Sequence, residues 1–170
     1  CGLGHCHPQI SAAIAEQAAI LVHTSNLYEI DWQETAGAKL CQVAGMDKVF
    51  FANSGAEANE AALKMARRYA HTRGMARPKV IVMQHAFHGR TLLTVSATAN
   101  ETARAGFYTL DDDFIRVPFG DIAAIEAALA AHDDVCAVML EPIQGESGVN
   151  TAADGFEYLA QVRAVCDAHD

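Results

Sequence analysis

Basic residues are scarce in this 170-residue sequence, in which 12 Lys and Arg stand against 21 Asp and Glu for a formal net charge of −9. Proteins that bind nucleic acid need clustered basic side chains to neutralise phosphates, so this balance argues against such a partner. It leaves room for one local anion site. Long apolar runs are missing as well, and none approaches the ~18 residues that indicate a membrane span, so we expect no membrane association.

Paired cysteine spacing is also absent. The five cysteines are scattered along the chain: Cys1, Cys6, Cys41, Cys136 and Cys166. We therefore expect no disulfide framework and favour a reducing, cytoplasmic location. No signal-peptide pattern opens the sequence. Because no Met precedes Cys1 and Asp170 directly follows a helical pattern, we expect a piece of a longer protein.

Strand and helix patterns alternate along the chain. Short apolar runs predict strands at residues 48–52, 79–84, 114–117 and 135–140. Amphipathic patterns predict helices at residues 8–22, 31–45, 54–74, 121–131 and 154–168. This alternation is typical of an α/β protein with a mainly parallel sheet flanked by helices. In such sheets ligands bind beyond the carboxyl ends of the strands, so the residues that follow each strand become the candidates for a site.

Capping signals mark several of these helix ends. Three pairs have the spacing of a capping box: Asp31 with Glu34, Ser54 with Glu57, and Asp154 with Glu157. Gly45 is expected to end the second helix as a C′ glycine.

The first predicted strand is followed by Asn53-Ser54-Gly55-Ala56. Small residues and several backbone N–H groups at a helix start form a natural cradle for a phosphate, and an ordinary capped helix explains the same residues. The GxxxxGK[ST] pattern of nucleotide-hydrolysing loops is absent, as is the GxGxxG pattern of dinucleotide-binding folds.

The second predicted strand leads into residues 85–91. Phe87 can stack on a planar ligand, or it can fill the core. Arg90 can hold a carboxylate through two parallel hydrogen bonds, or it can pair with a structural acid. His85 and His88 lack a carboxylate or thiol at metal-ligand spacing, so we predict no metal site.

Two carboxylates, Glu141 and Glu146, stand on the Gly-containing loop after the last predicted strand. They could transfer a proton, bind a cation or act as a charged gate, or the loop could simply be solvated. The Cys- and His-containing segment 1–7 lacks the second ligand pair of a zinc finger, and Pro8 suits a first helical position instead.

Five segments of the chain occur in the order of one known family: Leu3–Pro8, His23–Tyr28, Phe50–Glu60, Phe87–Thr91 and Glu141–Glu146. They resemble the class III, or ornithine-type, aminotransferases, which are pyridoxal-phosphate enzymes of fold type I. The resemblance runs from end to end of the chain. It implies that residues 1–47 form an N-terminal segment and residues 48–170 the first part of the cofactor-binding large domain, without the small C-terminal domain.

The resemblance also implies a cofactor site, made of Ser54, Gly55, Ala56, Phe87, His88 and Glu141. In it the helix start holds the phosphate, Phe87 stacks on the pyridine ring, His88 and Gly89 shape the turn, and Glu141 lies close by. Many acetylornithine enzymes have Thr where Ala56 stands, so one hydroxyl contact is expected to be missing while the backbone N–H remains.

For substrate binding, the resemblance implies that Arg90 binds the α-carboxylate and that Glu146 is a gating glutamate. Asn26 and Tyr28 match a stretch that lines the active site of the partner subunit, so a homodimer is expected. A gating Glu146 together with Arg90 favours transamination, because two substrates that alternate in one site require a switch between them.

The expected reaction converts N-acetylornithine and 2-oxoglutarate into N-acetylglutamate semialdehyde and glutamate, in arginine metabolism. Other class III enzymes, acting on succinylornithine, ornithine or 4-aminobutyrate, remain alternatives, as does a decarboxylase or racemase of the same fold. A non-catalytic anion-binding module or a purely structural domain is a rival of a different class.

The chain departs from the family in its lysines. The sequence contains four, and none lies in the family's lysine motif: Lys39, Lys48, Lys64 and Lys79. The Schiff-base lysine and the aspartate that pairs with the pyridine nitrogen are expected beyond Asp170. We therefore assign no catalytic residue and expect residues 1–170 alone not to transaminate.

Overall fold

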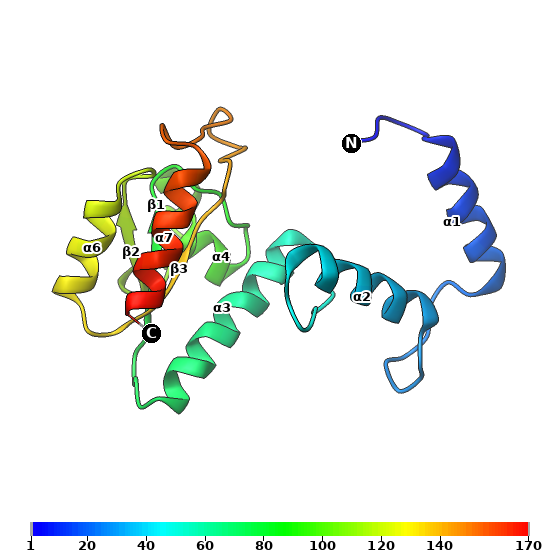
Figure 1. Ribbon diagram of the computed structural model, residues 1–170, viewed down its shortest axis with the longest axis horizontal. Coiled ribbons are helices and arrows are strands. Elements are labelled where there is room, and N and C mark those ends of the chain that lie inside the picture. Colours follow the sequence, from blue (N-terminus) through cyan, green and yellow to red (C-terminus); the bar gives the residue numbers. More distant parts are fainter. Residues whose placement is uncertain (1, 170) are drawn as a thin grey trace. The chain divides into compact units, whose positions relative to one another are not determined.

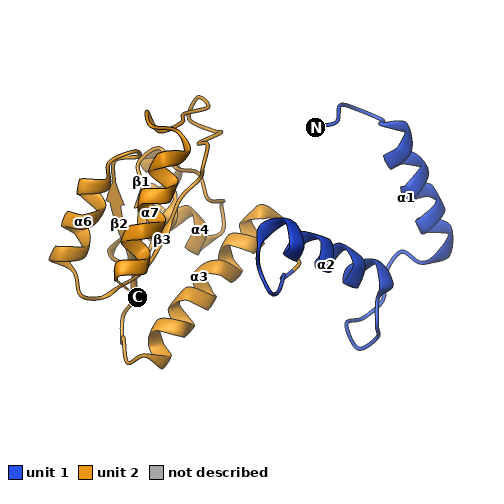
Figure 2. Ribbon diagram, in the orientation of Figure 1, with its two compact units in different colours: residues 1–50 blue, residues 51–170 orange. Residues whose placement is uncertain are grey.

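A computed structural model of the protein describes residues 2–169. The chain divides into two compact units, an N-terminal unit of residues 1–50 and a C-terminal unit of residues 51–170 (Figure 2). The N-terminal unit contains helices α1 (Pro8–Ile20) and α2 (Asp31–Ala44). Gly45 ends α2 in the left-handed conformation, with φ of 65°, so the expected C-terminal glycine is confirmed.

The start of α2 differs from the prediction. Ile30 is the N-cap residue, no side chain caps the helix, and Glu34 N donates to Ile30 O at 3.1 Å. The predicted capping box of Asp31 and Glu34 is therefore wrong. Asp31 already lies inside the first turn, where both carboxylates still interact favourably with the helix dipole.

The C-terminal unit is built on a parallel sheet with strand order β2–β1–β3 (Figure 1). The strands are β1 (Lys79–Met83), β2 (Phe114–Val117) and β3 (Val135–Met139). In the register, Val80 of β1 faces Phe114 on one side and Ala137 on the other. These three predicted strands are confirmed to within a residue.

Helices cover both faces of this sheet. The helices of the C-terminal unit are α3 (Gly55–Thr72), α4 (Leu92–Ala97), α5 (Glu101–Arg104), α6 (Ile122–Ala131) and α7 (Phe156–Ala168). Because side chains alternate along a strand, Val80 and Val82 pack on one face with residues of α3 and α4. Ile81 and Met83 pack on the other face with residues of α6 and α7. Among residues 2–169, no helix has both the length and the apolar character needed to cross a bilayer.

The predicted strand at 48–52 is wrong. These residues have no regular structure, and Val49, Phe50 and Phe51 are 41%, 68% and 43% exposed. A strand is stable only when a neighbour accepts and donates its backbone hydrogen bonds, and no strand in the described chain pairs with this run. An apolar pattern alone therefore did not produce a strand.

Two further differences concern helices. Gly155 is the N-cap of α7, without a side-chain cap, and Asp154 contributes only its backbone carbonyl to Glu157 N. The capping box predicted there is wrong. Residues 91–113 contain α4, α5 and a 3-10 turn (Asp111–Asp113) that the sequence did not predict. Each is shorter than two turns, so no amphipathic period could reveal it.

Candidate functional site

The start of α3 lies just after Asn53 and carries free hydrogen-bond donors. Ser54 Oγ accepts from Glu57 N at 3.2 Å, which confirms the predicted cap, while Glu57 Oε2 accepts from Asn53 N at 2.6 Å. The N–H groups of Gly55 and Ala56 belong to the first turn, where a helix supplies no carbonyl partner. The Ser54 hydroxyl can still donate its proton. This helix start can therefore bind an anion with two N–H groups and one hydroxyl.

The turn after β1 packs directly on this helix. Gly89 has φ of +135°, and a Cβ at that position would lie 2.5 Å from Thr94 Oγ1 and 3.0 Å from Ala56 Cβ. Asn59 Nδ2 of α3 also donates to His88 O at 2.8 Å. The structure thus brings the phosphate-cradle candidates and the residues after β1 together, and only glycine fits at the point of closest approach.

His88 lies in this turn and is 3% exposed. Its backbone N–H donates to Thr98 Oγ1 at 3.0 Å, while its buried Nε2 has no hydrogen-bond partner among the described residues. Burial lowers the pKa of His88, and the charge of Glu141 opposes this shift. The imidazole is therefore neutral at physiological pH, with one buried nitrogen left for a bound group. In residues 2–169, no three His, Cys, Asp or Glu side chains gather as a metal-binding group.

Phe87 is half-buried and is held from two sides. Its backbone N–H donates to Glu141 Oε1 at 2.9 Å. The guanidinium carbon of exposed Arg90 lies 5.7 Å from the centroid of the Phe87 ring, within the range of a cation–π contact. The aromatic and the arginine that were predicted to bind different parts of one ligand are therefore neighbours.

A cavity of about 500 Å³ opens beside this turn. Phe87 and Arg90 line it from the β1 side, and Glu146 and Ser147 line it from the loop after β3. Its size suits a small metabolite. Ser54–Ala56 are not among the described residues that line it, so the cradle is joined to the turn but stands outside the cavity.

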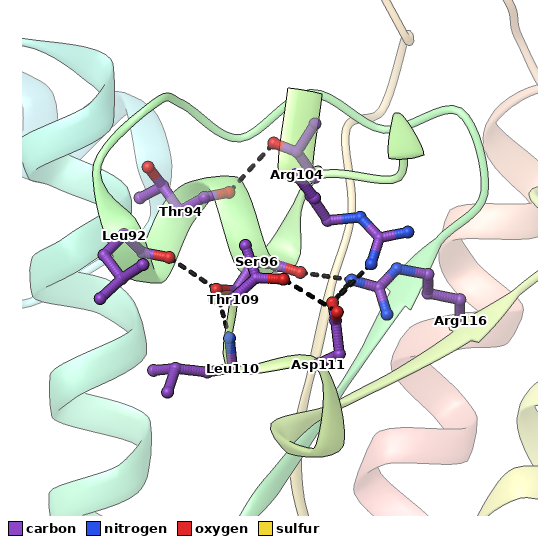
Figure 3. A network of polar contacts seen from close by, with 9 residues as sticks. Leu92, Thr94, Ser96, Arg104, Thr109, Leu110, Asp111 and Arg116 are labelled. Atoms are coloured by element: carbon purple, nitrogen blue, oxygen red, sulfur yellow. Dashed lines mark hydrogen bonds and ion pairs between the residues drawn. The ribbon is translucent and has the colours of Figure 1, made fainter. Parts of the chain in front are cut away.

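A polar network fixes another part of the cavity lining (Figure 3). Asp111 Oδ1 accepts from Arg104 at 2.5 Å and from Arg116 at 3.2 Å, and its Oδ2 accepts from Thr109 at 2.8 Å. Burial raises the pKa of Asp111, but the hydrogen bonds from Thr109 and Arg104 and the two positive charges lower it overall. Arg116 also donates to Ser96 O. Arg104 and Arg116 therefore have a structural role here, because both bind the carboxylate of Asp111.

Asn26 and Tyr28 belong to the N-terminal unit. Both are exposed, and they line a hollow of about 260 Å³ within residues 26–34. Their predicted place in a partner's active site stays a prediction.

Three residues that position the site were not predicted as such. Asn59 and Thr98 hold the His88 turn, and Gln144, which is 1% exposed, donates through Nε2 to Gln84 O at 2.7 Å. Asn59 and Gln144 lie inside the family-like segments, so that signal was present. Thr98 follows a helix too short to predict, so nothing in the pattern marked it.

Comparison with known proteins places the chain. A family model described as aminotransferase class-III matches residues 1–170. The chain belongs to this family. An acetylornithine aminotransferase from Nitrosomonas europaea is 47% identical to it over 98% of the chain and 42% of the relative. An acetylornithine/succinyldiaminopimelate aminotransferase from Yersinia pestis is 47% identical over 99% of the chain and 41% of the relative. The chain thus spans about two fifths of the length of the curated relatives it matches.

Solved structures of two aminotransferases share the fold. An ornithine aminotransferase from Toxoplasma gondii matches 98% of the chain and 39% of its own, with 34% identity and a TM-score of 0.89. The N-acetylornithine aminotransferase from Stenotrophomonas maltophilia matches 100% of the chain and 41% of its own, with 39% identity and a TM-score of 0.80. The expected α/β fold and the family resemblance are both confirmed.

Proposed function

We propose that the chain works as part of a pyridoxal-phosphate-dependent aminotransferase. This enzyme takes the amino group of N-acetylornithine and passes it to 2-oxoglutarate. The observation that carries the proposal is the junction of three segments at one sheet edge. The start of α3, the turn bearing Phe87 and Arg90, and the loop bearing Glu146 meet where an α/β sheet binds its ligands. Curated relatives named for acetylornithine support the choice of substrate.

The residues at this junction fit the cofactor. The donors of Ser54, Gly55 and Ala56 suit its phosphate, and the Phe87 ring suits the face of its pyridine ring. The unpartnered Nε2 of His88 is a buried polar atom that a bound group would satisfy. When bound, the cofactor supplies an electron sink for removal of the substrate's α-proton. Glu141 would act on this site through the backbone of Phe87, whose N–H donates to its Oε1.

In the proposal, the cavity receives the substrates. Arg90 offers its guanidinium to the α-carboxylate, and Glu146 contributes a negative charge to the lining of the same cavity. The two substrates differ at their distal end, which is a neutral acyl group in N-acetylornithine and a second carboxylate in 2-oxoglutarate. A carboxylate such as that of Glu146, which can pair with a cation or turn away, suits a site that binds the two in alternate half-reactions. Asn26 and Tyr28 would complete the site across a homodimer, in the cytoplasm.

Ornithine is the second candidate substrate. The Toxoplasma gondii ornithine aminotransferase, with its TM-score of 0.89, favours it on structural grounds. The difference between the two substrates is an acyl group on the distal nitrogen, so the distal ammonium charge of ornithine would need a carboxylate such as Glu146 near it.

The test uses the protein expressed from its complete reading frame and loaded with pyridoxal phosphate. We expect turnover of N-acetylornithine with 2-oxoglutarate to exceed that of ornithine and 4-aminobutyrate.

Arg90→Lys keeps the charge but loses the two-pronged geometry, so kcat/KM for the amino donor should fall by about 10- to 100-fold. Arg163→Lys, on the exposed face of α7, is the matched control. No turnover with any of these donors would contradict the proposal and favour a non-catalytic anion-binding module.

A further inference from the structure

Two side chains tie the loop after β3 to the turn after β1. The Glu141 carboxylate accepts from Phe87 N at Oε1 (2.9 Å) and from Gly145 N at Oε2 (3.2 Å). The Gln144 amide donates to Gln84 O at 2.7 Å. Two of these hydrogen bonds are long-range. Phe87 and Glu141 are 54 positions apart in the sequence, and Gln84 and Gln144 are 60 positions apart. They are possible because β1 and β3 are paired neighbours whose carboxyl ends meet at one edge.

The turn after β1 needs outside support. His85 adopts the left-handed conformation with φ of 64°, which is costly for a residue other than glycine, and Gly89 follows with φ of 135°. Such a backbone persists only where its surroundings hold it. Glu141 supplies the hydrogen bond at Phe87, midway between these two positions of positive φ.

The loop after β3 is closed at its base. Gln144 and Asn150 exchange both backbone hydrogen bonds at 2.9 Å, so residues 145–149 project as a loop. Gly145 stands at its root and gives its N–H to Glu141. Glu146, which lines the cavity, is the next residue. The position of its backbone therefore depends on the contact between Glu141 and Gly145.

We propose that Glu141 is a positioning residue that joins two walls of the cavity. One of its oxygens holds the Phe87 wall and the other holds the Glu146 wall, so this single carboxylate sets the spacing between them. A carboxylate suits this task because both oxygens accept, whereas an amide offers one acceptor and one donor group. Charge-assisted hydrogen bonds are also about twice as strong as neutral ones. What the cavity binds rests on the proposed function, but the joining of its walls does not.

The first experiment measures hydrogen–deuterium exchange in the cofactor-free protein from its complete reading frame, read by mass spectrometry with residue-level fragmentation. In Glu141→Ala, which removes both acceptor oxygens, we expect the amides of Phe87 and Gly145 to exchange about tenfold faster or more. The amide of His88, which is bonded to Thr98, should keep its rate. Glu126→Ala, which removes an exposed carboxylate on α6, is the matched control and should change neither amide.

Two outcomes would overturn the proposal. Unchanged exchange at either Phe87 or Gly145 would show that Glu141 does not hold both walls. Equally faster exchange throughout β1 would show a general loss of stability instead of a local link. Glu141→Asp, which keeps the charge on a shorter side chain, serves as a second variant; it should loosen at least one of the two amides while leaving β1 protected.

The second experiment is a double-mutant cycle in the loaded enzyme. If Glu141 acts through the Glu146 loop, Glu141→Gln should raise KM for 2-oxoglutarate about tenfold in the parent enzyme and change it little in a Glu146→Gln background. Additive effects would contradict the link between the walls. If the enzyme shows no transamination at all, the proposed function fails, while the exchange experiment still decides the role of Glu141.

Discussion

The N-terminal and C-terminal units differ in how much of their secondary structure is buried by packing. In residues 2–50, Ile14 of α1 and Trp32 of α2 are 64% and 68% exposed, and Gly37 is the buried residue of the two helices. In residues 51–169, Val80 to Met83 of β1 are fully buried between two helical layers. The first two helices therefore have little packing within their own unit, whereas the sheet and the site on its edge depend on packing between distant segments.

The sharpest way to test this contrast is to remove the same side chain from both units. Ile81→Ala empties a fully buried position in the central strand, so the free energy of unfolding should fall by about 2–5 kcal/mol. Ile14→Ala, at an exposed position of α1, should change it by less than about 0.5 kcal/mol. Urea denaturation followed by circular dichroism measures both. Equal losses would mean that α1 is buried against something outside its unit.

Glycine replacement gives a smaller but similar contrast. Gly89→Ala combines a disfavoured φ with a Cβ 2.5 Å from Thr94 Oγ1, so we expect a loss of about 2–3 kcal/mol together with weaker cofactor binding. Gly45→Ala meets open space at φ of 65° and should cost only about 1 kcal/mol. Thermal unfolding compares the two variants. A Gly89→Ala protein as stable as Gly45→Ala would refute the close approach of the turn to α3.

The N-terminal ends of α3 and α2 offer a third comparison. Ser54→Ala removes the oxygen that caps α3 and should lower the free energy of unfolding by about 1 kcal/mol. It should also weaken the affinity of the cofactor-free protein for pyridoxal phosphate, measured by absorbance titration. Asp31→Ala, at the start of α2 where no side chain caps, should cost less than half as much. A larger effect at Asp31 would reverse the assignment of the caps.

The smallest expected effect is a pH dependence from the C-terminal unit. Burial lowers the pKa of His88 in the folded protein. As pH falls through about 6.5, His88 therefore takes up a proton in the unfolded chain but stays neutral in the folded protein. The free energy of unfolding should therefore fall as pH drops through 6.5 toward the lower folded pKa of His88. His88→Gln should remove this part of the slope, and His23→Gln, an exposed position of the N-terminal unit, should keep it. Urea titrations at pH 7.5, 6.5 and 5.5 measure the slopes.

The sequence predicted those elements whose signal is local. Strands at 79–83, 114–117 and 135–139 were visible as short apolar runs, and the Ser54 cap and the Gly45 end as local motifs. The run at 48–52 carries the same apolar signal, yet no described strand pairs with it. Strand formation depends on a partner elsewhere in the chain, which an apolar pattern does not reveal.

The candidate site divides in the same way. Residue types at strand ends pointed to Phe87, Arg90 and Glu146, and the structure places all three on one cavity. The supports around them were hidden, because the contacts of Thr98 and Gln144 arise between segments 10 and 60 residues apart. A sequence therefore indicates which side chains carry chemistry more readily than which ones hold them in position.

The strand order has a consequence for biosynthesis. β1 is made first and lies in the middle of the sheet. One of its edges therefore stays uncovered until β2 leaves the ribosome, and the other stays uncovered until β3 does. Parallel pairing of this kind is slow, because a helical crossover separates each pair. During that interval its apolar run, from Val80 to Met83, is open to wrong partners. Pauses in translation between residues 117 and 135 should therefore affect the yield of folded protein more than pauses within the first 50 residues.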